Sequence, residues 1–277
     1  MDIYKYSAIG RPLDFSYQSN KNAAIIALLF FVFGVVWKLI AGFLFGPSLI
    51  FGLGAAATAF LAWAIGREVD PDYNATAFLG AVFSFTGLLV FGMPLILGML
   101  WLLFLMRIFN RTTGLPAKIN DSIIIFLLTT WMVYSSENAL YAFAAGLVYF
   151  LDARFRPKHH FHLYFSILAI AGGIIVYLLN FANLGELNVR VPEQVPAVTI
   201  SFFFLLHVFS TKEVLSTCDV NNSPLSPARV RWTQIITTLV VLVFALTVLK
   251  GFWLWFPVWS VMSAAILTRL FRIFSSR

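Results

Sequence analysis

The chain has 277 residues, of which 60% are hydrophobic and only 11% are charged, and its formal net charge is +7. A soluble globular chain has about 25% charged and about 45–50% apolar residues, so this composition excludes a soluble domain, a disordered chain, a collagen and a disulfide scaffold. It predicts an all-α fold, a polytopic bundle of transmembrane helices. Lys and Arg are scattered between apolar runs instead of clustering on one polar face, so we expect no nucleic-acid partner.

Ten apolar runs have about the length that a helix needs to cross a bilayer. They cover residues 23–45, 48–66, 75–91, 93–109, 121–135, 137–152, 162–181, 196–210, 233–250 and 252–271. Several are short, and 121–135 with 137–152 could instead form a re-entrant hairpin, so the sequence is compatible with eight to ten spans. The predicted organisation is a cytosolic N-terminal segment over 1–22, one transmembrane helical domain over 23–271 and a cytosolic tail over 272–277.

Short turns alternate with longer polar loops along the chain. The predicted turns are Gly46-Pro47, Gly92-Met93-Pro94 and the neighbours of Ser136. If the N-terminus faces the cytosol, every Lys and Arg lies on the cytosolic side except Lys38, Arg190 and Lys250. Cytoplasmic loops carry the Lys and Arg excess. We therefore expect an integral protein of an inner (cytoplasmic) membrane with both termini in the cytosol.

The loop after the second span carries three carboxylates, Glu68, Asp70 and Asp72, around Pro71. Carboxylate oxygens are the ligands that hard divalent cations prefer. These residues therefore predict a metal site for Mg²⁺. The alternative is a tight turn in which Asp-Pro ends one helix and Asp72 or Asn74 caps the next.

The second cytosolic loop, residues 107–122, carries basic and hydroxyl side chains around Gly114. Such groups can cradle a phosphate. The predicted phosphate-binding residues, one of them from the first loop, are Arg67, Arg107, Arg111 and Lys118. The alternative is that Asn120 or Asp121 caps the fifth span and the basic residues only set the topology.

The third cytosolic loop is basic and holds three histidines, His159, His160 and His162. Histidine clusters suggest a transition-metal site, but adjacent histidines on a short stretch rarely face one ion. We favour contact between this loop and lipid headgroups.

The leading functional hypothesis is a membrane-embedded enzyme acting on a lipid-linked or isoprenoid phosphate at the cytosolic face. Carboxylates at the cytosolic ends of spans resemble the arrangement in intramembrane prenyltransferases, although the paired Asn-Asp-x-x-Asp motifs of that family are missing here. One alternative is a non-catalytic subunit or scaffold with a protein partner in a membrane complex, because the spans contain few buried polar groups. Another is a facilitator for a small amphiphilic solute, suggested by the span count and a partial match between residues 10–17 and 66–73.

Overall fold

The computed structural model describes residues 3–186, 191–211 and 213–275 of the chain. Within these ranges the chain forms eleven α-helices and one short 3-10 helix. The α-helices are α1 (Gln18–Ile40), α2 (Phe45–Val69), α3 (Asn74–Phe91), α4 (Ile96–Asn110), α5 (Ile119–Ser136), α6 (Leu140–Arg154), α7 (His162–Leu178), α8 (Val191–Ser210), α9 (Pro227–Thr247), α10 (Gly251–Leu254) and α11 (Phe256–Ser275). The all-α prediction is therefore confirmed.

Six of the described helices, α1, α2, α3, α8, α9 and α11, are long and apolar enough to cross a membrane. Two shorter apolar helices, α4 and α7, accompany them. By the length and composition of these helices the chain is a polytopic membrane protein. The count of ten spans and their orientation stay predictions.

The chain divides into two compact units that are interleaved along the sequence. Unit 1 comprises Met1–Pro12, Trp101–Val189 and Lys212–Leu249, and unit 2 comprises Leu13–Leu100, Arg190–Thr211 and Lys250–Arg277. Unit 1 therefore contains α5, α6, α7 and α9, and unit 2 contains α1, α2, α3, α8, α10 and α11. The boundary between the units falls inside α4. The single domain over 23–271 stays a prediction.

The first predicted turn is wrong by a few residues. Helix α1 ends at Ile40 and α2 begins at Phe45, so Gly46 and Pro47 lie in the first turn of α2 rather than between the helices. Proline fits the first turn because its missing N–H would have no helical partner there. The reversal of the chain uses Gly42 instead, whose φ of 84° lies in the left-handed region that favours glycine.

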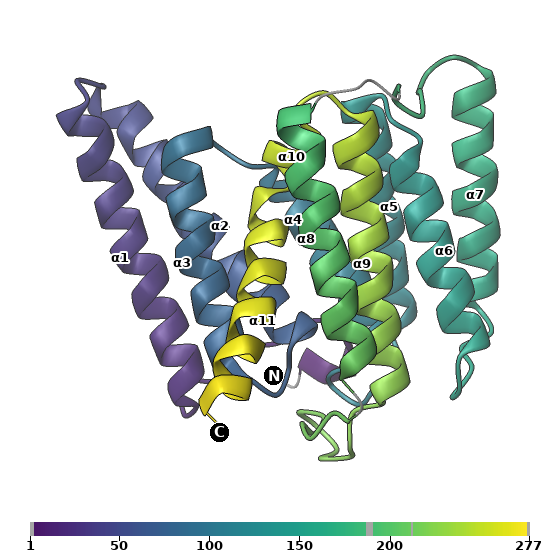
Figure 1. Cartoon of the computed structure of the whole chain (residues 1–277). Coiled ribbons are helices and arrows are strands. Elements are labelled where there is room, and N and C mark those ends of the chain that lie inside the picture. The colour runs from purple at the N-terminus through teal and green to yellow at the C-terminus, as the bar shows by residue number, and fades with distance from the viewer. Residues whose placement is uncertain (1–2, 187–190, 212, 276–277) are drawn as a thin grey trace. The chain divides into compact units, whose positions relative to one another are not determined.

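Helices in unit 2 approach one another through small residues. In Figure 1 α1, α2 and α3 follow one another in space, and α11 lies beside α3. A Cβ atom added to Gly66 of α2 would lie 2.6 Å from the Cα atom of Ala77 in α3. One added to Gly80 of α3 would lie 2.8 Å from Val261 in α11. Small residues allow such close packing of helices in lipid.

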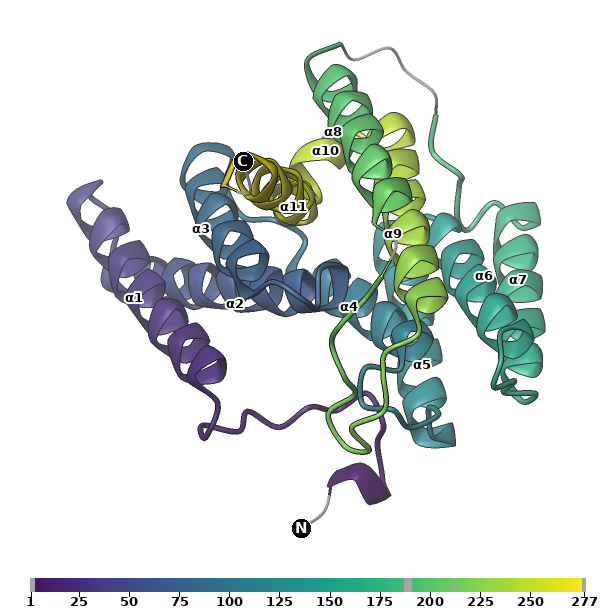
Figure 2. The same cartoon turned by 60° about the horizontal axis from the view of Figure 1, so that its bottom comes forward.

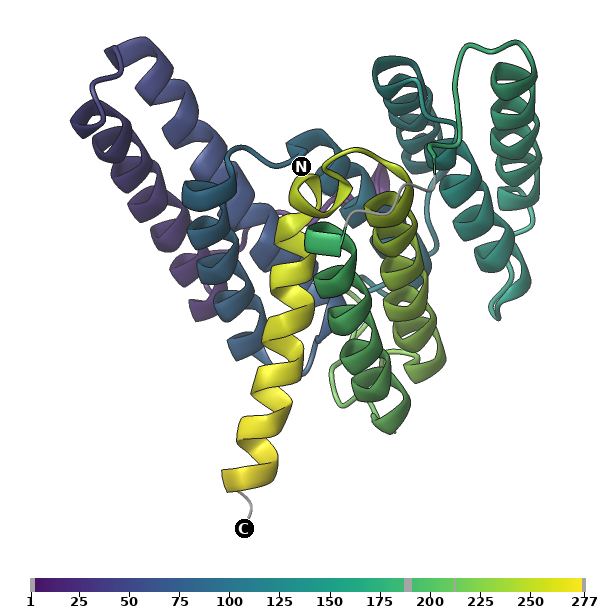
Figure 3. The same cartoon turned by 45° about the horizontal axis from the view of Figure 1, so that its top comes forward.

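Polar contacts between helices fix the packing of unit 1. Figures 2 and 3 show α6 and α7 side by side, and the Ser166 hydroxyl of α7 donates to the Gly146 carbonyl of α6 at 2.8 Å. The Trp101 indole of α4 donates to the Thr129 hydroxyl of α5 at 3.0 Å. These contacts bring the C-terminal end of α6 and the N-terminal ends of α5 and α7 to the same end of unit 1, where the polar residues gather.

Candidate functional site

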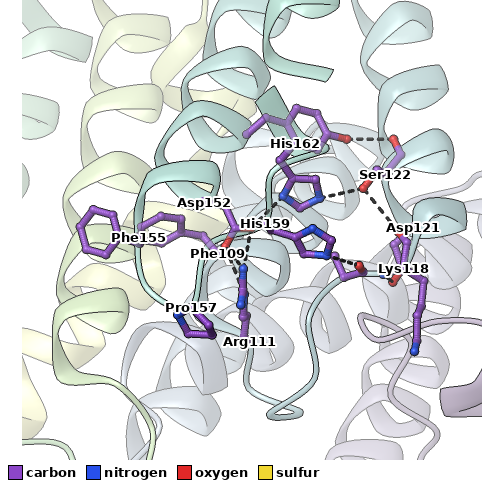
Figure 4. Close-up of polar contacts among 12 residues, drawn as sticks. Phe109, Arg111, Lys118, Asp121, Ser122, Asp152, Phe155, Pro157, His159 and His162 are labelled. Carbon is purple, nitrogen blue, oxygen red and sulfur yellow. Dashed lines mark hydrogen bonds and ion pairs between the residues drawn. The ribbon is translucent and has the colours of Figure 1, made fainter. Parts of the chain in front are cut away.

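The centre of the polar cluster in unit 1 is Asp152, a fully buried residue in the last turn of α6. One carboxylate oxygen, Oδ2, accepts from Arg111 Nη2 at 2.8 Å and from His162 Nδ1 at 2.8 Å. The other, Oδ1, accepts from Arg229 Nη1 at 2.6 Å. Figure 4 shows Asp152 between Arg111 and His162. A buried carboxylate is tolerated because charged donors surround it.

The two arginines reach Asp152 from the ends of different helices. Arg111 follows α4 with a φ of 55°, and Arg229 lies in the first turn of α9, where the Ser226 hydroxyl accepts from its N–H. Arg229 also donates to the carbonyls of Phe109 at 2.8 Å and Phe155 at 3.2 Å. These carbonyls belong to the C-terminal ends of α4 and α6, which carry partial negative charge. The Arg229 guanidinium therefore connects the C-terminal ends of α4 and α6 with the N-terminal end of α9.

His162 extends the cluster to a serine. Its Nε2 atom lies 2.8 Å from the Ser122 hydroxyl oxygen in the first turn of α5, and both side chains are fully buried. In the neutral imidazole, Nδ1 donates to the carboxylate of Asp152 and Nε2 accepts from the Ser122 hydroxyl, whose oxygen also lies 3.4 Å from the Lys118 carbonyl oxygen. The Tyr149 hydroxyl donates to the Ser122 carbonyl at 2.9 Å. The result is a continuous chain from carboxylate through imidazole to hydroxyl.

His159 joins the loop after α6 to the loop before α5. Its ring stacks on that of His162 with 4.6 Å between centroids, and its Nε2 atom donates to the Ala117 carbonyl at 2.8 Å. Burial and the neighbouring His162 lower the pKa of His159, which favours the neutral form. His159 and His162 therefore both make hydrogen bonds to protein groups. Among the described residues, no group of three or more His, Cys, Asp and Glu is arranged to hold a metal ion.

Three of the predicted phosphate-binding residues belong to unit 1. Arg107 donates to the Ile9 carbonyl at 3.0 Å, Arg111 binds Asp152, and Lys118 is half-buried at the N-cap of α5. Asp121 accepts from the Lys118 N–H at 2.8 Å, which confirms that Asp121 caps the fifth span. Phosphate binding by these residues stays a prediction.

The remaining predicted residues, Arg67, Glu68, Asp70 and Asp72, belong to unit 2. Asp70 ends α2, is 7% exposed, and accepts from the Thr76 hydroxyl at 2.6 Å. The charges of Arg272, Asp72 and Arg67 all act on this carboxyl, so these residues form one electrostatic cluster. Glu68 is fully buried in the last turn of α2.

Arginine side chains flank the turn between α2 and α3. Arg67 donates to the Pro71 carbonyl at 3.2 Å and to the Asn74 side chain, and the Arg272 guanidinium lies 3.3 Å from the centroid of the Tyr73 ring. The N-cap of α3 is Tyr73, whose own side chain makes no cap hydrogen bond. Asp70 is the C-cap of α2, so Asp-Pro ends this helix as the tight-turn alternative expected. Cation binding by Glu68, Asp70 and Asp72 stays a prediction.

Replacing Asp70 with Asn should change how stability depends on pH. Burial raises the pKa of Asp70 above its ordinary value of 3.8, so the folded protein holds this proton to a higher pH than the unfolded chain does. The resulting stabilisation is complete below about pH 4 and is lost as the pH rises through the raised pKa. Thermal unfolding in detergent at several pH values across this range should show a smaller loss of stability with rising pH in Asp70→Asn than in the unchanged protein. The same dependence of melting temperature on pH in both proteins would contradict the raised pKa of Asp70.

Four residues of the two clusters received no role from the sequence, namely Ser122, Asp152, Arg229 and Arg272. One available signal was that Asp152 ends an apolar run, because ionisable groups at such positions need partners. Its partners come from α7, α9 and the residue after α4, so local sequence patterns could not identify them.

Comparison with protein-family models, with curated proteins and with solved structures gives no match for this chain.

Proposed function

We propose that this polytopic protein is a membrane-embedded enzyme that acts on a lipid-linked or isoprenoid phosphate at the cytosolic face. The observation that carries the proposal is the cluster around the α2–α3 turn, where the charges of Arg67, Arg272 and Asp72 all act on Asp70. Guanidinium groups bind phosphate oxygens, and a carboxylate pair binds a divalent cation. A cluster that holds both guanidinium groups and a carboxylate pair can therefore bind a phosphate together with its metal ion.

Each group of the cluster has a role in the proposal. Arg67 and Arg272 bind phosphate oxygens, and Asp70 and Asp72 hold Mg²⁺, which neutralises the charge of the phosphate. Cation binding requires an ionised Asp70, so the raised pKa of this carboxyl predicts that cation binding weakens as the pH falls. The Tyr73 ring orients Arg272 through the cation–π contact.

The arrangement of helix ends within each unit supports helices that cross in alternating directions, as ten spans with both termini on one side require. In unit 2 the Arg269 guanidinium of α11 donates to the His207 carbonyl in the last turn of α8 at 2.8 Å. The Thr76 hydroxyl of α3 lies 2.9 Å from Thr268 of α11. If α8 and α11 are the eighth and tenth spans, their C-terminal ends lie together, and the end of α11 meets the beginning of α3, the third span. Spans that cross in alternating directions require this arrangement. In unit 1 the ends of α4 and α6 meet the beginnings of α5, α7 and α9 in the same way.

The test compares Mg²⁺-dependent binding of an isoprenyl monophosphate by the purified protein and by the double variant Asp70→Asn/Asp72→Asn. Losing second-shell partners of a bound metal already costs on the order of 10- to 100-fold in affinity, and losing both carboxylates should cost at least as much. Native mass spectrometry of each protein, with and without a chelator, gives the fraction that carries the lipid.

Asp14→Asn is the control, because it removes one negative charge from an exposed carboxylate at the position that corresponds to Asp70 in the partial repeat. Its binding should equal that of the unchanged protein. Equal binding by the double variant, at normal folded yield, would refute the site. A protein partner at fixed stoichiometry, with no bound lipid, would favour a scaffold.

A further inference from the structure

The chain of hydrogen bonds in unit 1 has the connectivity of an activated nucleophile. Asp152 Oδ2 binds His162 Nδ1 at 2.8 Å, and His162 Nε2 binds the Ser122 hydroxyl at 2.8 Å. A hydroxyl bonded to a base that a third group orients is the arrangement of nucleophilic catalysis. We propose that Ser122 is a nucleophile that accepts the acyl group of a carboxylic ester. This inference is independent of the phosphate site in unit 2.

The proton movements balance within these three residues. As the Ser122 oxygen attacks the carbonyl carbon of the ester, its proton passes to His162 Nε2, and Asp152 stabilises the imidazolium that forms. When the ester C–O bond breaks, the same proton passes to the leaving alcohol. Water or an acceptor alcohol then attacks the acyl-serine, with His162 again taking and returning one proton.

The position of Ser122 suits the negative charge that develops during this attack. Ser122 lies in the first turn of α5, whose leading amides have no partners within the helix and form the positive end of the helix dipole. Such a field stabilises an oxyanion, although the Asp121 carboxylate in the same turn opposes it. Asp121 beside it uses Oδ2 to accept from the N–H groups of Lys118 and Ala8, each at 2.8 Å, so this part of the site is held in place.

Two features of the structure should slow the reaction of Ser122 with an ester. Arg111 and Arg229 also bind Asp152, and their charges weaken its attraction for an imidazolium. Ser122 is also fully buried, and the contacts of His159 with His162 and Ala117 join the loop 155–161 to the imidazole that binds Ser122. An ester reaches the hydroxyl when this loop lifts, so loosening the His159 contact should speed the reaction.

The experiment uses a fluorophosphonate probe on the full-length protein in its membrane. The serine oxygen forms a bond to phosphorus as fluoride leaves, and peptide mass spectrometry locates the adduct. We expect slow labelling at Ser122, none in Ser122→Ala, and a loss of about 100-fold or more in rate in His162→Gln, as expected for removal of a general base. His159→Ala should label faster than the unchanged protein.

Ser84→Ala is the control, since Ser84 is also a fully buried helical serine but lies in unit 2 and donates to the Gly80 carbonyl of its own helix. Its labelling rate should be unchanged. No adduct in either the unchanged protein or His159→Ala, or an adduct on another serine, would overturn the proposal.

Discussion

Replacing Asp152 with Asn should lower the free energy of unfolding by about 3–5 kcal/mol, because it leaves buried arginines without their carboxylate. Arg111 and Arg229 are 7% and 2% exposed, so water cannot replace the lost charge. The variant keeps the size of the side chain, so the loss reports the charge rather than a cavity. Denaturant unfolding in a mild detergent measures the difference.

Asp219→Asn provides the control for this prediction. Asp219 pairs with Arg11 in the same unit, but the side chains of this pair are 35% and 21% exposed. Partly exposed ion pairs contribute about 0–1 kcal/mol, so the change in stability should be within that range. If the two variants lost the same amount, the Asp152 cluster would not be a main source of stability in unit 1.

Replacing Gly66 with Val should destabilise unit 2 by about 1–3 kcal/mol or more, the cost of overpacking a close contact. An added Cβ would lie 2.6 Å from the Cα atom and 3.3 Å from the backbone nitrogen of Ala77. Backbone atoms cannot turn aside as a flexible side chain can, so α2 and α3 must separate. The Gly66 carbonyl accepts from the Asp70 N–H at 2.9 Å, so lipid-phosphate binding should weaken as well.

The control is Gly172→Ala in α7, where an added Cβ would meet nothing within 4 Å. Alanine at an open helical position is more favourable than glycine by roughly 0.5–1 kcal/mol. Its melting temperature should therefore stay the same or rise, whereas that of Gly66→Val should fall. Equal melting temperatures for both variants would contradict the close approach of α2 and α3.

The helices could be predicted from sequence because each depends on a local apolar run. Every run found in the sequence overlaps a described helix, and Asp121 was one of two residues expected to cap the fifth span. The error at Gly46-Pro47 arose because proline and glycine also occur in a helical first turn.

Contacts between distant segments could not be predicted in this way. Arg229 meets Asp152 from 77 residues further along the chain, and Thr268 meets Thr76 from 192 residues further along. Nothing in the neighbouring residues specifies either partner, because the meeting depends on how several helices pack. The sequence identified polar loops but not which loops share a cluster.

The interleaving of the two units has a consequence for how the protein is made. Helix α3 ends at Phe91, but its neighbour α11 begins only at Phe256. During synthesis, the face of α3 that carries Thr76 and Gly80 therefore has no α11 to pack against until all of unit 1 has emerged from the ribosome. Long-range pairing of this kind is slow and exposes unfinished surfaces. The insertion machinery or a chaperone would have to shield this face until α11 arrives.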